Sequence, residues 1–413
     1  MRHGHRRTKT VPCSTLAASK SLLIEGWRTT NHSYALVNQY QIAALRKLRN
    51  LRLFHLDMPF CNESLNIHAI SSGFSPADRQ GIDRLTTPGA EKVDCAYRIF
   101  SPFRAYNETT PRRTVTFIVT EIGLHDGNFT KGSENPEVFM RNGDRIVTAS
   151  CWSRDRLVEW GFSGDKIDII PHGVDRAYFQ PLTAAERVRN RNVLGIGDDE
   201  ILFLNVGAAI WTKGTDILLL AFAYLRLNRR KIRLILRDRS DMYGVSAAGD
   251  IAKLSAKYPG LFNANTIAGI SIISDDLTRD QMRALYGAAD CYVSPYRAEG
   301  FNLPVLESIA CGTPVIVTRG GATDDFCNDS VALRIRGTPG DFENASENHR
   351  GRYITPDLGE LVEAMDCLAT RQNSGLDRFD EAREALTKKF SWHNAALQLA
   401  KITVGHENEA ALF

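Results

Sequence analysis

The sequence of 413 residues has no C-x-x-C pair, no long hydrophobic run and no excess of one charge. Its eight cysteines are scattered away from histidines, which argues against a zinc site or disulfide framework and favours a reduced, cytoplasmic protein. The most apolar stretch, Ile217–Leu225, has nine residues, whereas a membrane-spanning helix needs about 20. With 51 basic and 48 acidic residues, the net charge is only +3. This balance excludes a global polycation built to bind nucleic acid.

What the sequence does contain is an alternation of short β-rich runs with helical patterns, typical of parallel α/β sheets. The basic start, Met1–Lys9, is followed by a segment too short and too polar for a signal peptide. The polar stretch Asn62–Arg113 is expected to run over the surface of the first sheet. The chain is predicted to divide into a disordered basic leader (1–20), an N-terminal domain (21–175), a linker (176–199), a C-terminal domain (200–388) and a C-terminal helix that packs back on the N-terminal domain (389–413).

Two α/β domains leave a cleft between them as the natural ligand site. The most informative stretch for that site is Glu299-Gly-Phe-Asn-Leu-Pro-Val-Leu-Glu307, which follows the strand Cys291–Ser294. Pro304 suits the first position of a helix, and Gly312 suits the left-handed position after its end. A helix that starts at the carboxyl end of a parallel strand offers free N–H groups to an anion such as a diphosphate.

Two carboxylates flank this predicted anion site. Glu307 is expected to accept hydrogen bonds from vicinal hydroxyls, as acidic residues do for ribose in dinucleotide folds. Glu299 is expected to face whatever the diphosphate carries. The alternative is a capped helix with solvated glutamates, because acidic residues at helix starts are common for dipole reasons alone.

A second strand, glycine turn and helix start lie earlier in the same predicted domain. The strand Ile201–Val206 is followed by Gly207, then by Lys213 and Gly214. A lysine in this loop can neutralise a phosphate as a compact point charge. Alone it would be an ordinary surface lysine, and its interest comes from the neighbouring motif.

Together these residues closely resemble family 4 of the retaining glycosyltransferases, which have the two-domain GT-B fold with two Rossmann-like domains. The resemblance rests on the E-x7-E pattern of Glu299 and Glu307, on Gly207 to Gly214, on Ile169-Ile-Pro-His-Gly-Val-Asp175 and on Phe390-Ser-Trp-His-Asn394. It covers about residues 140–400, while residues 20–140 match only in their α/β pattern.

The resemblance implies a hexosyltransferase that moves a sugar from a nucleoside-diphosphate sugar to a glycan or lipid-linked acceptor. It implies that Glu307 binds ribose, Glu299 contacts the donor sugar and Lys213 contacts the diphosphate, with Glu299 and Lys213 as the catalytic pair. Donor contacts are further expected from Gly207, Gly300, Phe301, Asn302 and Leu303. No cofactor or metal is expected, because no D-x-D occurs in a suitable loop.

Three departures from the family pattern affect the expected site. Ala208 stands where the family usually has a phosphate-binding arginine, and Arg237 and Arg297 are the candidates to replace it. Asn302 replaces a glycine, and asparagine tolerates left-handed backbone. Glu121 stands where a histidine often follows the strand, with His125 four residues on.

Acceptor or sugar contacts are therefore expected from His32, Glu121 and His125. For the segment around His32, helix capping by Asn31 or Ser33 is an equal alternative. The basic run Arg226, Arg229, Arg230, Lys231 and Arg233 suggests either peripheral contact with anionic lipid at the inner face of the membrane or a solvated helix end. Two other functions stay open, a catalytically weak nucleotide-sugar-binding relic and another GT-B enzyme such as a sugar-nucleotide epimerase.

Overall fold

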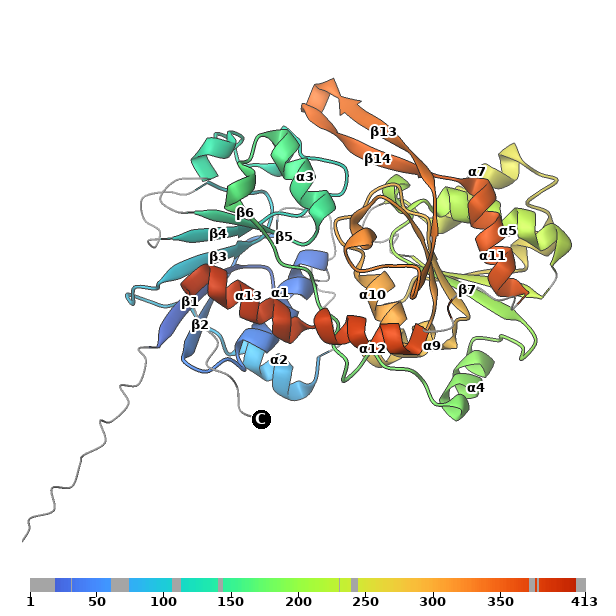
Figure 1. Ribbon diagram of the computed structural model, residues 1–413, viewed down its shortest axis with the longest axis horizontal. Coiled ribbons are helices and arrows are strands. Elements are labelled where there is room, and N and C mark those ends of the chain that lie inside the picture. Colours follow the sequence, from blue (N-terminus) through green and yellow to red (C-terminus); the bar gives the residue numbers. More distant parts are fainter. Residues whose placement is uncertain are drawn as a thin grey trace, which may run out of the picture.

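The computed structural model describes residues 19–30, 32–60, 74–105, 113–139, 144–229, 231–238, 244–370, 376 and 379–405. Two parallel six-stranded sheets lie side by side, each flanked by helices (Figure 1). The predicted α/β architecture with two sheets is confirmed. The leader expected over residues 1–20 falls almost entirely outside the described residues. None of the helices in the described ranges is long and apolar enough to cross a membrane.

The first sheet has the strand order β2-β1-β3-β4-β5-β6, and every neighbouring pair is parallel. Its inner strands are almost fully buried, because helices cover both faces of the sheet. The strands are β1 (Lys20–Gly26), β2 (Leu51–Asp57), β3 (Cys95–Ile99), β4 (Thr114–Phe117), β5 (Arg145–Thr148) and β6 (Ile167–Ile169), and the helices are α1 (Ser33–Leu45), α2 (Pro76–Asp83) and α3 (Cys151–Trp160).

Strand β3 corrects the expectation that residues 62–113 only run over the surface. It lies between β1 and β4 and is buried at every position. Its arginine, Arg98, donates to Glu25 of β1 at 2.8 Å, and both side chains are at least 90% buried. The prediction was wrong because Arg98 made the strand look exposed to solvent in the sequence. The partner that neutralises its charge, Glu25, lies 73 residues away and could not be recognised from the local pattern.

The second sheet has the order β12-β11-β10-β7-β8-β9 and is also parallel. The strands expected at 201–206 and 291–294 are both present. The strands are β7 (Ile201–Val206), β8 (Ile232–Arg237), β9 (Ile270–Ile273), β10 (Cys291–Ser294), β11 (Val315–Thr318) and β12 (Ala332–Ile335), and the helices are α5 (Thr215–Asn228), α7 (Ala247–Lys257), α8 (Ala264–Ile267), α9 (Arg279–Ala288), α10 (Leu303–Ala310) and α11 (Leu358–Ala369).

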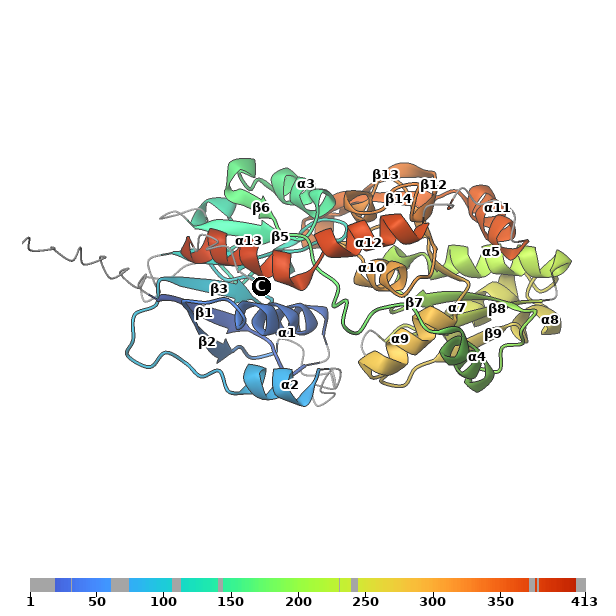
Figure 2. The ribbon, with the colours of Figure 1, turned by 60° about the horizontal axis from the view of Figure 1, so that its bottom comes forward.

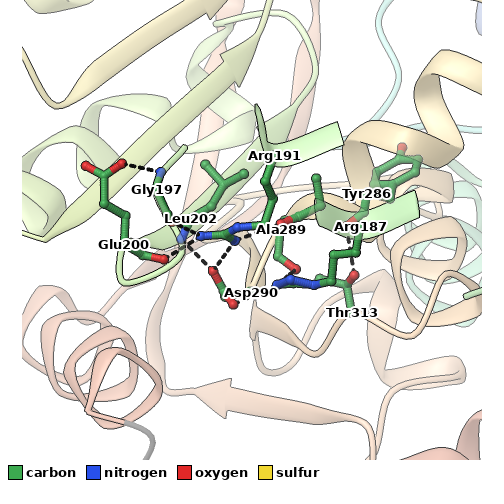
Figure 3. A network of polar contacts seen from close by, with 10 residues as sticks. Arg187, Arg191, Gly197, Glu200, Leu202, Tyr286, Ala289, Asp290 and Thr313 are labelled. Atoms are coloured by element: carbon green, nitrogen blue, oxygen red, sulfur yellow. Dashed lines mark hydrogen bonds and ion pairs between the residues drawn. The ribbon is translucent and has the colours of Figure 1, made fainter. Parts of the chain in front are cut away.

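The charged connector between the sheets contains a helix of its own, α4 (Ala184–Val193). Arg191 at its end is buried and donates to Asp290 at 2.9 Å and to the carbonyl oxygens of Gly197 and Glu200 (Figure 3). Asp290 also accepts from the backbone N–H of Leu202 at 2.8 Å. This network fixes α4 to the amino ends of β7 and β10.

The last two helices join the halves a second time. Helix α12 (Phe379–Lys389) contacts α10, whereas α13 (Trp392–Val404) lies on the first sheet beside α1 (Figure 2). The indole of Trp392 stacks on Tyr40 of α1, with ring centroids 4.7 Å apart and planes 5° from parallel. Between these helices, the carbonyl of Phe390 accepts from the N–H of Val174 at 2.9 Å. The chain therefore crosses between the two halves twice, once after β6 and once between α12 and α13.

A third connection is an antiparallel hairpin, β13 (Gly337–Asn344) and β14 (His349–Pro356), which leaves the second half and reaches across to α3 (Figure 1). The N–H of Arg352 donates to the carbonyl of Ile122 at 2.9 Å. Gly123 and Gly351 allow this approach, because a Cβ on either would lie 2.0 Å from a backbone oxygen of the opposite segment. We refer to residues 337–356 below as the bridging hairpin.

Candidate active site

A cleft of about 470 Å³ lies between the two halves, at the carboxyl ends of both sheets. This is where parallel α/β sheets bind ligands. Nearly all of the predicted donor and sugar residues line it, from both halves of the chain. They are His32, Glu121, Gly207, Lys213, Glu299, Gly300, Phe301, Asn302, Leu303 and Glu307.

The start of α10 forms one end of this cleft. The helix begins at Leu303, one residue before the expected Pro304, and Asn302 adopts the left-handed conformation that the sequence suggested, with φ of 77°. The side-chain amide of Asn302 donates to the hydroxyl of Ser294 at 3.0 Å, which holds the turn against β10. A Cβ on Gly300 would lie 2.2 Å from Val119, so only glycine lets the turn approach the first half. The turn that leads into α10, residues 300–303, is thereby held at the cleft, while the N–H of Val305 donates to the carbonyl of Asn302.

Three charged side chains meet beside this helix. The ammonium of Lys213 lies 2.8 Å from Glu299 and 2.7 Å from Glu121, which comes from the opposite half of the chain. Glu121 also accepts a hydrogen bond from the hydroxyl of Thr212 at 2.7 Å. An ammonium has three N–H donors, and these two carboxylates account for two of them.

Burial and charge act in opposite directions on this cluster. Burial raises the pKa of Glu299 to about 7, with a smaller lowering from the neighbouring Lys213 and a further raising from Glu121. Burial alone would lower the pKa of Lys213, but the two carboxylates outweigh it and raise that pKa above its ordinary value. Lys213 is thus a cation at neutral pH, and the Glu299 carboxylate is easier to protonate than that of an ordinary glutamate.

Glu307 lies in the same cleft on α10 and is also buried. Its carboxylate accepts from the hydroxyl of Tyr286 at 2.9 Å. Burial raises the pKa of Glu307 to about 7, with smaller lowering effects from Tyr286 and Arg279. A carboxyl group in this position can exchange hydrogen bonds with hydroxyl groups of a ligand.

The loop that carries Lys213 is held in place by Arg297. Arg297 donates to the carbonyl of Trp211 and to both carboxylate oxygens of Asp216, at 2.7–2.8 Å. Arg297 is therefore used to shape the loop and does not line the cleft. Arg237, the other candidate to replace the arginine missing at Ala208, lines the cleft and donates to the carbonyl of Asp275 at 3.2 Å.

Of the two histidines predicted to contact a sugar or acceptor, His32 lines the cleft and His125 does not. His32 lines the cleft and caps α1 itself, because its Nδ1 accepts from the N–H of Tyr34 at 3.1 Å. The predicted cap Ser33 is instead the first helical residue, and Asn31 lies outside the described residues. His125 is not among the cleft-lining residues, and its ring lies 5.1 Å from that of His349 in the bridging hairpin.

Two contributors were not anticipated from the sequence, Tyr286 and Arg279, both on α9 and both lining the cleft. The guanidinium of Arg279 stacks 3.7 Å above the ring of Tyr178 and donates to Asp175 at 2.5 Å. A signal for α9 was available, since Thr278 and Gln281 form a capping box at its start. No group of three or more metal-ligating side chains is found within the described ranges.

Comparison with known proteins agrees with this geometry. Residues 186–346 match the family model described as "Glycosyl transferases group 1". Among curated proteins, the MMP alpha-(1->4)-mannosyltransferase of Mycolicibacterium hassiacum is 26% identical over 62% of this chain and 53% of its own length. The D-inositol 3-phosphate glycosyltransferase of Acidothermus cellulolyticus is 30% identical over 55% of this chain and 50% of its own. The chain thus spans about half the length of the curated relatives that it matches.

Solved structures resemble the chain over nearly all of its length. A glycosyltransferase from Rickettsia africae superposes with a TM-score of 0.63 at 15% identity, covering 93% of this chain and 97% of the other. Anabaena HepE in complex with UDP gives a TM-score of 0.63 at 12% identity, covering 92% and 98%. The chain therefore has the GT-B fold, and its residues 186–346 match the glycosyl transferases of group 1.

Proposed function

We propose that this chain is a retaining, metal-independent glycosyltransferase, which moves a hexose from a nucleoside-diphosphate sugar to a glycan or lipid-linked acceptor. The observation that carries the proposal is the convergence of Lys213, Glu299, Glu307 and the start of α10 in one cleft. A nucleoside-diphosphate sugar has the matching parts, which are a ribose, a diphosphate and a sugar. The match to group 1 glycosyl transferases supports the same activity.

The chemistry follows from where negative charge develops. During transfer the bond between the anomeric carbon and the diphosphate oxygen breaks, the hydroxyl oxygen of the acceptor bonds to that carbon, and the hydroxyl proton passes to the leaving diphosphate. Negative charge grows on the leaving phosphate before it takes up this proton. The ammonium of Lys213 and the N–H groups around Phe301–Pro304 would stabilise that charge, while the N–H of Val305 donates to the carbonyl of Asn302. Pro304 contributes none, because it has no N–H. Donors of this kind, placed in a site that excludes water, are worth about 3–4 kcal/mol each in comparable enzymes.

The two glutamates would hold the rest of the donor. Glu307 would bond the ribose hydroxyls, with its second oxygen fixed by Tyr286. Glu299 would face the donor sugar and, because burial raises its pKa to about 7, could donate or accept a hydrogen bond there. Retention of the anomeric configuration and independence from metal are parts of the proposal that rest on the family resemblance.

The experiment that tests the proposal is donor turnover by the wild-type chain and by Glu299→Gln. We expect wild type to release nucleoside diphosphate from its donor in the presence of acceptor and to keep the anomeric configuration of the product, as read by NMR. A matched control is Glu137→Gln, on an exposed surface outside the cleft. Inverted product or a strict need for a divalent ion would reject the corresponding part of the proposal.

Two rival functions make different predictions in the same assay. A nucleotide-sugar-binding relic, suggested by Ala208, would bind the donor tightly without turning it over. A sugar-nucleotide epimerase of the GT-B type would change the donor without any acceptor. Product analysis with and without acceptor separates all three.

Peripheral membrane contact also stays a proposal. In the basic run, Arg226 is buried and bonds the carbonyl of Ile232, while Arg229 pairs with Asp366 and Lys231 with Asp199. Arg230 lies outside the described residues. Acidic neighbours already pair with Arg229 and Lys231. We therefore expect that replacing both residues by uncharged ones changes sedimentation with anionic vesicles only slightly. A complete loss of sedimentation would make this run the docking surface.

A further inference from the structure

The two walls of the cleft differ in chemistry. The second half contributes nearly all of the charged lining residues, namely Lys213, Arg237, Asp276, Arg279, Glu299 and Glu307. The facing wall, from the first half, is built of aromatic and aliphatic side chains. These are Tyr34, Leu36, Val37, Tyr40, Phe117 and Val119. If the donor occupies the charged wall, the second substrate must meet it from the apolar one.

The two histidines on the apolar wall, His32 and His172, are uncharged at neutral pH. Burial lowers the pKa of His32 to about 4 and that of His172 to about 3. The geometry agrees, because His32 uses a ring nitrogen to accept from Tyr34, and His172 packs between Phe117 and Trp392. A neutral imidazole can exchange hydrogen bonds with hydroxyl groups, but it brings no positive charge to balance an anion.

The charge that this wall does carry is negative. Among the described lining residues of the first half, Glu121 is the charged one, and its carboxylate is held by Thr212 and Lys213. A phosphate or carboxylate placed here would find the one charge of the wall already paired with Lys213, and the described lining of the first half offers it no lysine or arginine. It would also lose water against Tyr34 and Leu36, which costs free energy unless new hydrogen bonds replace that water.

We propose that this wall selects an acceptor whose entering part is uncharged and has an apolar face, such as a neutral glycoside with an alkyl or aryl aglycone, over a phosphorylated or carboxylated sugar. The inference rests on the proposed function and adds the chemical class of the acceptor. The half-buried Tyr34 and Leu36 would contact the apolar face, while His32 and the exposed Ser33 would meet hydroxyl groups.

The test compares octyl hexosides with their 6-phosphates, titrated by calorimetry into the full chain with and without nucleoside diphosphate. We expect the neutral glycoside to bind about tenfold more tightly than its phosphate, because the phosphate gives up water at this wall without gaining a cation from it. Equal or tighter binding of the phosphate, or no binding of any neutral glycoside, would overturn the inference. If the chain binds no nucleoside diphosphate, that result counts against the proposed function. The titrations without nucleotide then still measure whether the chain prefers the neutral glycoside to its phosphate.

A charge introduced into the wall provides a second measurement. Ser33→Lys places a cation at an exposed position of the cleft, at the first residue of α1. We expect it to shift the preference toward the phosphorylated glycoside by about tenfold. Ala184→Lys is the matched control, because Ala184 is the exposed first residue of α4 and does not line the cleft. The inference fails if both variants change the preference equally, or if neither does.

Discussion

Glu307→Gln should make the protein more stable at alkaline pH, although Glu307 belongs to the proposed donor site. The glutamate is buried, and burial raises the pKa of its carboxyl from 4.5 to about 7. A carboxyl whose pKa is raised by folding contributes no penalty below pH 4.5, where both states are protonated. Its penalty grows as the pH rises toward 7 and is complete above it.

The size of this penalty follows from the pKa values. Each tenfold change in a protonation equilibrium is worth about 1.4 kcal/mol, so the rise from 4.5 to about 7 corresponds to about 3 kcal/mol. Glutamine has nearly the same shape and keeps an oxygen that accepts from Tyr286. It does not ionise, and the variant should avoid the penalty.

Urea denaturation at pH 4.5, 6, 7 and 8.5 measures the difference directly. We expect wild type and Glu307→Gln to have similar free energies of unfolding at the lowest pH. At the highest pH the variant should be more stable by up to about 3 kcal/mol. The exposed Glu137→Gln serves as the control and should show no such trend. A difference that does not depend on pH, or a variant that is less stable at pH 8.5, would refute the reasoning.

Three further predictions concern other parts of the cleft and its supports. Lys213→Met should lower kcat/KM for transfer by about 100-fold or more, because a donor to the leaving phosphate is lost; activity within a few-fold of wild type would argue against that role. Gly351→Ala should cost about 1–3 kcal/mol in urea denaturation and free the bridging hairpin for proteolysis, since its Cβ would meet Ile122. Gly260→Ala, in open space, should do neither. Arg279→Lys should cost about 1–2 kcal/mol through lost stacking on Tyr178, and an unchanged urea midpoint would contradict this.

Local sequence signals were sufficient for the start of α10. Pro304, Gly312 and the preceding strand fix the turn, the helix and its end within about 25 residues of chain. The structure shifts the first helical residue by one position and confirms the left-handed Asn302. Short-range backbone chemistry decides such an element, which is why it can be predicted without a structure.

Contacts between distant residues were beyond the same approach. Glu121 was noticed as a departure from the family pattern, yet its partner Lys213 lies 92 residues away in the other half. Arg98 disguised a buried strand because its partner Glu25 is 73 residues away. The bridging hairpin has polar residues on both faces and gave no periodic signal for a buried element. In each case the position of the residue or segment depends on a contact with a distant part of the chain, which the local sequence does not reveal.

The central claim is that the cleft binds a nucleoside-diphosphate sugar through Lys213. A thermal-shift screen of wild type and Lys213→Met against UDP-, GDP- and ADP-sugars tests it most directly, because a ligand that binds the native state raises the melting temperature. We predict a concentration-dependent rise for wild type with at least one of these donors and a much smaller rise for the variant. No rise with any donor, or equal rises in both proteins, would contradict the claim.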